Sequence, residues 1–212
     1  EGTRPTLPWG LKTGLAVDEP IPLLDTLHAD KTRFVTRSVA NHLNDISKRD
    51  PNLVVDTLSK WKDWGRQDAA ELDWITRHAL RSLVKQGNPQ ALAMLGFHAA
   101  PKITLSPIEI APDTTVRIGD TATFAFTIEA AQDENLLVDY VIDFVKANGR
   151  TSPKVFKLKK LTLKTGERIT ITKNHRFLKD ATTFTHYAGT HCLTLQINGQ
   201  SFGNCTFELL DA

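Results

Sequence analysis

Apolar positions follow two different periods along the chain. Between Pro20 and Phe97 they recur every three to four residues, the spacing of one helix face. This pattern predicts helical segments over residues 21–28, about 31–49, 51–64 and about 69–86. Proline at position 51 suits the first turn of a helix, and glycine at position 87 marks a helix end. We therefore expect a helical domain over residues 1–97.

After His98 the pattern changes to short runs rich in β-branched and aromatic residues, separated by turns. Such runs in close succession are typical of a small β-sandwich, which we expect over residues 98–212. Asn198-Gly199 lies between two runs and predicts a two-residue hairpin. The predicted strands cover residues 103–110, 115–118, 122–128, 136–144, 155–163, 168–172, 191–197 and 202–209.

The predicted hairpin brings the two cysteines opposite each other, because a two-residue turn pairs Cys192 with Cys205. At a non-hydrogen-bonded pair a disulfide is geometrically conceivable. In a reducing compartment we expect two buried free thiols instead. A zinc site would need two more ligands, and His191 points to the opposite face of the strand, so no metal is expected.

Two of the predicted helices repeat each other. Phe34-Val35-Thr36-Arg37 and Trp74-Ile75-Thr76-Arg77 lie 40 residues apart, and Leu43 and Leu83 keep the same offset. A period of this length is typical of arrays of helical pairs. Such arrays form curved layers whose concave side commonly binds a long partner. We therefore expect a polymer or an extended surface as the partner.

Polar stripes on these helices point to nucleic acid. Residues at i, i+4 and i+8 share one helix face, so Arg37, Asn41 and Asp45 form one polar stripe. At the 40-residue offset, the corresponding stripe of the next repeat is basic and consists of Arg77, Arg81 and Lys85. Residues 31–97 carry 11 basic against 7 acidic residues, an excess of 4, whereas the whole chain has a net charge of only +2. A phosphate backbone would fit this surface. Its predicted contacts are Arg37, Asn41, Lys48, Arg77, Arg81 and Lys85, and Asn44 falls on the same polar side.

Asp45 is the single carboxylate in these two stripes, and two interpretations are open. It can pair with Arg49 at i+4 as an exposed helix salt bridge worth about 0.3 to 0.5 kcal/mol. Spacing alone favours that interpretation. Alternatively, a carboxylate held near bound DNA can stabilise a sugar cation as a base departs, or orient the attacking water.

Two helical motifs and the N-terminal segment carry a resemblance to a known family. They are Arg37-Ser38-Val39-Ala40-Asn41-His42-Leu43-Asn44-Asp45, Trp74-Ile75-Thr76-Arg77-His78-Ala79-Leu80 and Glu1-Gly2-Thr3-Arg4-Pro5-Thr6-Leu7-Pro8-Trp9. These segments resemble the AlkC family of bacterial alkylpurine DNA glycosylases. The resemblance covers essentially the whole chain and implies HEAT-like α-helical repeats followed by an immunoglobulin-like β-sandwich. The sandwich match is generic, whereas the helical motifs are specific.

The resemblance implies a function in base excision repair. Methylated purines such as 3-methyladenine would be released from double-stranded DNA by hydrolysis of the N-glycosidic bond, without an inorganic cofactor. Carried over by motif, Asp45 is the carboxylate close to the deoxyribose, Glu1 a second acidic group and Trp9 an aromatic wall against the nucleotide. Since a methylated purine is already cationic, electrostatic stabilisation of the sugar cation should suffice.

The chain departs from the family pattern at its start. It begins at Glu1 rather than Met, and the first helical repeats of the family are absent, so we expect a larger protein that has lost an N-terminal part. No apolar run approaches a bilayer span, and no secretory signal is recognisable. We therefore expect a cytoplasmic monomer that does not contact membranes.

Other side chains that could belong to a functional site also have a purely structural interpretation. Trp61, Trp64 and Trp74 are expected to pack between repeats, and His42 within its helix's apolar stripe, while His78 is open between packing and a role in the site. The lysine cluster at positions 154, 157, 159, 160 and 164 can grip phosphates or protect an edge strand from pairing. The alternative functions are a non-catalytic helical-repeat DNA-binding protein and a protein-interaction scaffold.

Overall fold

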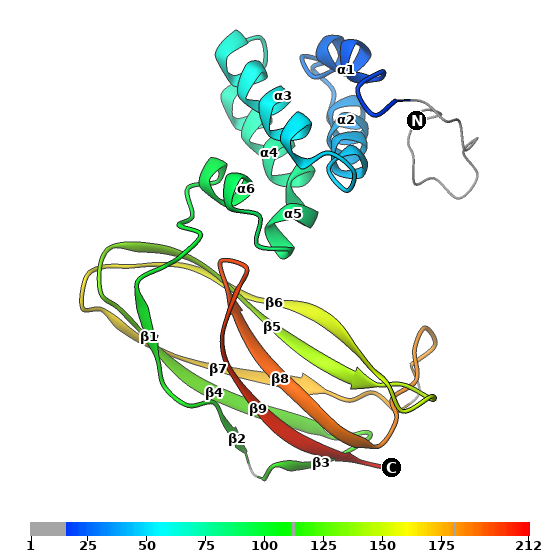
Figure 1. Cartoon of the computed structure of the whole chain (residues 1–212), viewed down its shortest axis with the longest axis vertical. Helices are drawn as coiled ribbons and strands as arrows, with labels where there is room; N and C mark the ends of the chain where they lie inside the picture. The colour runs from blue at the N-terminus through cyan, green and yellow to red at the C-terminus, as the bar shows by residue number, and fades with distance from the viewer. Residues whose placement is uncertain (1–15, 112, 180) are drawn as a thin grey trace. The chain divides into compact units, whose positions relative to one another are not determined.

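The computed structural model describes residues 16–111, 113–179 and 181–212. The chain divides into two compact units, Glu1–Leu95 and Gly96–Ala212. In Figure 1 the first unit is helical and the second is built of strands. The fold is a HEAT-like helical array followed by an immunoglobulin-like β-sandwich, as the sequence predicted.

The helical unit consists of short helices joined by tight turns. Side chains cap three of them: Asp50 accepts a hydrogen bond from the backbone N–H of Leu53, Asp68 from those of Ala70 and Glu71, and Asn88 from that of Ala91. Each cap accepts from backbone donors that the first helical turn leaves without a partner. The helices are α1 (Ile21–Leu27), α2 (Arg33–Ile46), α3 (Pro51–Trp64), α4 (Ala69–Ala79), α5 (Arg81–Lys85) and α6 (Pro89–Met94).

One predicted helix was wrong in its extent. The segment predicted over 69–86 is divided at Leu80 into α4 and α5, and α6 follows where no separate helix was predicted. Leu80 and Leu83 are both buried, so the apolar pattern continues across the break. The core of this unit also buries Leu43, Trp61 and Ile75 completely.

The second unit consists of two sheets. In one, β4 pairs with β1 and β2, and also with β7; in the other, the order is β3-β9-β8-β5-β6. All described pairs are antiparallel except β3 with β9. The strands are β1 (Ile103–Leu105), β2 (Glu109–Ala111), β3 (Thr115–Arg117), β4 (Thr121–Ala130), β5 (Glu134–Val145), β6 (Thr151–Leu163), β7 (Arg168–Arg176), β8 (Gly189–Ile197) and β9 (Gln200–Leu210).

Alternation along the strands builds the core of the sandwich. In β4, Phe124, Phe126 and Ile128 are buried while the residues between them are less so, as expected for one buried sheet face. The run predicted as one strand over 103–110 is two strands, because Pro107 interrupts it. β6 lies at the edge of its sheet and carries four exposed lysines, Lys154, Lys157, Lys159 and Lys160.

The predicted pairing of the cysteines is wrong. An irregularity between Leu195 and Gln196 shifts the register of the β8–β9 hairpin, so that Cys192 lies opposite Thr206 and Cys205 opposite Leu193. Neighbouring positions of a strand point to opposite faces of the sheet. Cys205 therefore packs against the core while Cys192 points away from it, and both are free thiols.

Candidate functional site

Asp45 lies near the C-terminal end of α2 and is 3% exposed. Lys48 Nζ contacts Asp45 Oδ1 at 2.9 Å, an ion pair at spacing i+3. The predicted partner Arg49 is therefore wrong.

Asn44 does not lie on the polar face where the helical pattern placed it. Its side chain is 2% exposed and donates from Nδ2 to the carbonyl oxygen of Ala79 at 2.9 Å. Its Oδ1 accepts from the hydroxyl of Ser82 at 3.2 Å. A helical wheel shows only that Asn44 leaves the apolar stripe; packing against α4 then buries it.

Asn41 is the centre of a second polar cluster, between α2 and α4. Its Oδ1 lies 2.8 Å from His78 Nε2 and accepts from Arg81 Nη2 at 3.0 Å. Arg81 also donates from Nη1 to the backbone oxygen of His78. Burial lowers the pKa of His78, and the charges of Arg81 and Arg37 lower it further. The structure thus brings two predicted site residues together and adds His78, which the sequence analysis left open.

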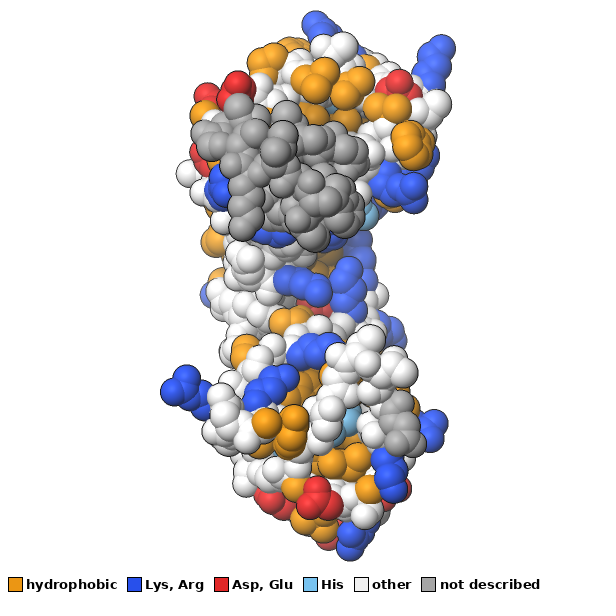
Figure 2. Space-filling model, turned by 90° about the vertical axis from the view of Figure 1, so that its right-hand side faces the viewer, with side chains coloured by type: hydrophobic (Ala, Val, Ile, Leu, Met, Phe, Trp, Pro, Cys, Tyr) orange, Lys and Arg blue, Asp and Glu red, His pale blue; other side chains and the backbone are white. Residues whose placement is uncertain are grey.

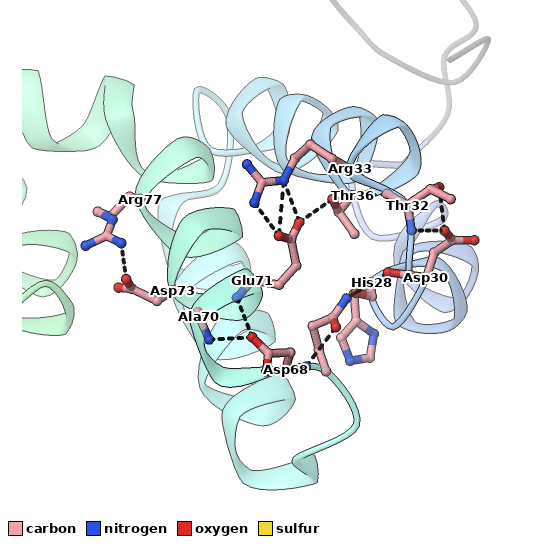
Figure 3. A network of polar contacts seen from close by, with 11 residues as sticks. His28, Asp30, Thr32, Arg33, Thr36, Asp68, Ala70, Glu71, Asp73 and Arg77 are labelled. Atoms are coloured by element: carbon pink, nitrogen blue, oxygen red, sulfur yellow. Dashed lines mark hydrogen bonds and ion pairs between the residues drawn. The ribbon is translucent and has the colours of Figure 1, made fainter.

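A third group at the start of α2 and α4 was missed by the sequence analysis. Glu71 accepts from Arg33 Nε at 2.9 Å and from the Thr36 hydroxyl at 2.5 Å, and Figure 3 shows its carboxylate turned toward both. Hydrogen bonds from Arg33 lower the pKa of Glu71 against the opposing effect of burial. The 40-residue repeat was a usable signal, since it places the first turns of the two helices side by side.

Three other residues that were predicted to contact phosphate lie at the surface, outside these clusters. Arg37 and Lys85 are exposed, as is Arg77, which forms an ion pair with Asp73 on the same helix. In Figure 2, Lys and Arg side chains gather along one side of the helical unit. Glu1 and Trp9, the second predicted acid and the predicted aromatic wall, lie outside the described residues.

The tryptophans differ in their surroundings. Trp61 is fully buried, donates from Nε1 to Asp25 at 2.7 Å and stacks on His28 at 4.3 Å, which confirms its packing role. Trp74 lies between the Arg33 guanidinium, 4.0 Å from the ring centroid, and the His78 ring at 4.8 Å. Trp64 is 37% exposed. Trp74 thus packs between two side chains that belong to polar clusters on α2 and α4.

Within the described ranges, no group of three or more His, Cys, Asp or Glu side chains is arranged to hold a metal ion. No helix among those residues has both the length and the apolar character to cross a membrane. What the helical unit offers is a carboxylate paired with lysine, beside a set of arginine and amide donors.

The sequence and fold match known proteins. Residues 105–211 match the family model described as Uncharacterised protein YhaZ, C-terminal Ig-like domain. The chain is 38% identical over 212 residues to Uncharacterized protein YhaZ of Bacillus subtilis (strain 168), covering 99% of this chain and 58% of that protein. It also matches the structure of Pseudomonas fluorescens alkylpurine DNA glycosylase AlkC bound to DNA containing an abasic site analog. That match has a TM-score of 0.89 at 37% identity and covers 99% of this chain and 58% of AlkC.

Proposed function

Because the chain belongs to the AlkC family and carries the C-terminal Ig-like domain of the YhaZ family, we propose that it is a DNA glycosylase of base excision repair. Its substrate is double-stranded DNA containing alkylated purines such as 3-methyladenine. The observation that carries the proposal is the match to AlkC over 99% of this chain. The chain spans 58% of the length of both relatives, so the proposal concerns the activity of the whole protein.

The helical unit supports DNA binding. Arg37, Arg77 and Lys85 are exposed, and Arg81 is held by Asn41 and His78. Guanidinium and ammonium groups bind phosphate through charge-assisted hydrogen bonds, which position a duplex without reading its sequence. We assign these residues, with Asn41 and Lys48, to the phosphate backbone around the lesion.

Asp45 supplies the chemistry in this proposal. The bond between deoxyribose C1′ and the purine nitrogen breaks, and its electron pair leaves with the methylated base, which becomes neutral. The carboxylate stabilises the sugar cation until water adds to C1′ and loses a proton. Glu1 is proposed as a second acidic group and Trp9 as the aromatic wall. We further propose that the protein works as a monomer in the bacterial cytoplasm.

The Asp45–Lys48 ion pair favours a second candidate, a helical-repeat protein that binds DNA without turnover. In that case the carboxylate is neutralised within its own helix and contacts no nucleotide. The two candidates differ in what Asp45→Asn does.

The test is release of free 3-methyladenine from methylated duplex DNA by the whole protein and by its Asp45→Asn variant, with P. fluorescens AlkC as the positive control. Asp56→Asn, at an exposed position of α3, is the matched control for the lost charge. The glycosylase proposal expects release that Asp45→Asn abolishes while DNA binding persists. Binding without release by the wild type would support the second candidate, and release by Asp45→Asn would remove Asp45 from the chemistry.

A further inference from the structure

Asn41 Oδ1 is the acceptor for two donors that come from α4 and from α5. His78 Nε2 lies 2.8 Å and Arg81 Nη2 3.0 Å from this one oxygen. A guanidinium has donors only, so the atom that Arg81 contacts must be the amide oxygen rather than the amide nitrogen. This fixes which way the amide of Asn41 is turned.

The same contact fixes the tautomer of His78. Because the oxygen of Asn41 faces it, Nε2 must carry the proton and donate. Burial lowers the pKa of His78, with Arg81 and Arg37 as further causes, so the ring is neutral near pH 7 and Nδ1 has no proton. The ring is also held by stacking on Trp74, at 4.8 Å between centroids and 10° between planes.

With Oδ1 occupied by His78 and Arg81, the amide of Asn41 still has the two N–H groups of Nδ2 to donate. In the parts of the chain that the structure describes, nothing accepts a hydrogen bond from Nδ2, and Asn41 is partly exposed. Asn41 lies one turn before Asp45 and one turn after Arg37 on α2, so the three side chains share a helix face. A donor pair on that face suits an acceptor ligand.

We propose that His78 is a positioning residue for DNA binding, which orients the Asn41 amide so that its N–H groups donate to a backbone phosphate or sugar oxygen beside the lesion. This inference rests on the proposed function and names a contact within it. His78 itself touches no nucleotide; it acts through Asn41, and it supports Arg81 through its backbone oxygen.

Three variants test the proposal by their affinity for a duplex that contains an abasic site analog, measured by fluorescence anisotropy. His78→Phe keeps a ring that can stack on Trp74 but removes the donor, and we expect about fivefold to tenfold weaker binding, the effect of losing one hydrogen bond of about 1 kcal/mol. His78→Gln restores a donor near the position of Nε2 and should bind within about twofold of wild type.

Asn41→Asp keeps the acceptor oxygen and removes the N–H groups, so binding should fall at least about tenfold through lost donation and charge repulsion. Asn52→Asp, at an exposed position of α3, makes the same change elsewhere and should have little effect. Thermal unfolding of each variant shows whether a weak binder is still folded.

Recovery by His78→Gln together with loss in His78→Phe supports the positioning role, because a simple packing role would favour phenylalanine. Equal binding by wild type and His78→Phe, or unchanged binding by Asn41→Asp, would overturn the inference and leave the glycosylase proposal intact. Binding that follows these expectations without any base release would overturn the glycosylase proposal alone. Absence of DNA binding by the wild type would overturn both.

Discussion

Asn44 Nδ2 donates to the Ala79 carbonyl oxygen at 2.9 Å, a buried hydrogen bond between α2 and the end of α4. The same amide accepts from Ser82 in α5, so one side chain holds both segments on either side of the break at Leu80. The Asn44 side chain thus hydrogen-bonds to the end of α4 and to α5, the two helices that the break at Leu80 separates.

Replacing Asn44 with Leu should destabilise the helical unit. The substitution removes the partner of the buried Ala79 carbonyl oxygen, which costs about 1 to 3 kcal/mol, and also the partner of the Ser82 hydroxyl, which is only partly buried and costs less. Trp fluorescence during urea unfolding measures the change, because every described tryptophan lies in the helical unit. Ser82→Ala is the milder control, and an Asn44→Leu variant as stable as wild type would contradict the role.

Acid should destabilise the sandwich through His175. Burial lowers its pKa to about 4, with smaller effects of His186, Lys173 and Lys154, and Nδ1 lies 2.9 Å from the Tyr140 hydroxyl. The unfolded chain binds the proton near the ordinary value of 6.5, so this contribution to stability is full above about pH 6.5 and is lost toward pH 4. The loss amounts to roughly 3 kcal/mol at most.

The pH effect is measured as the free energy of unfolding between pH 7 and pH 4, followed by the circular dichroism of the strands. His175→Gln keeps a side chain that can accept from Tyr140 but does not titrate, so its stability should fall less over the same range. An identical pH dependence in the two proteins would assign the acid sensitivity to other groups.

The two thiols should differ in reactivity and should not join. Burial raises the pKa of Cys205 to about 11, with Cys192 as a second cause, and the thiolate is the reactive form. Alkylation of the folded protein at pH 8, followed by mass spectrometry, should modify Cys192 at least about tenfold faster. In the Cys192→Ser variant, the remaining thiol of Cys205 should react slowly. In the wild-type protein, a disulfide between Cys192 and Cys205 formed within the folded chain under mild oxidation would contradict the register.

Removing Asp73 should strengthen DNA binding if the proposed function holds. Asp73 forms an ion pair with Arg77, and both side chains are about half exposed. Asp73→Asn frees the guanidinium for phosphate and deletes a negative charge, so we expect about twofold to fivefold tighter binding at low salt that fades as salt rises. Asp63→Asn, also exposed, controls for net charge. Equal gains in the two variants would show a general charge effect.

The periodic parts of the fold were predictable. The apolar spacing and Pro51 predicted the extent of α3, and the alternating strands of the sandwich were found close to their bounds. The division at Leu80 was not visible because apolar residues continue through it. The bulge in the β8–β9 hairpin was not visible either, because a register shift of one residue leaves no mark in the sequence pattern. The predicted pairing of the two cysteines was wrong for that reason.

The sequence predicted which helix face carries the site residues, but not their hydrogen-bond and ion-pair partners. The stripe through Arg37, Asn41 and Asp45 follows from helix geometry alone. Which polar residue meets a neighbouring helix depends on packing, so Asn44 was placed on the wrong side. The sequence analysis named only Arg49, at i+4, as an ion-pair partner of Asp45, and the structure has Lys48, at i+3, in that role.

The contacts between α2 and α4 also have a mechanical consequence. Arg33 and Glu71 join the helices near their first turns, and Asn44 joins them near their last, so neither end can slide without breaking polar bonds. The two helices therefore move as one stiff body. Under the proposed function, a duplex that docks on them meets a backbone frame that is already fixed, so association has little main-chain ordering to add.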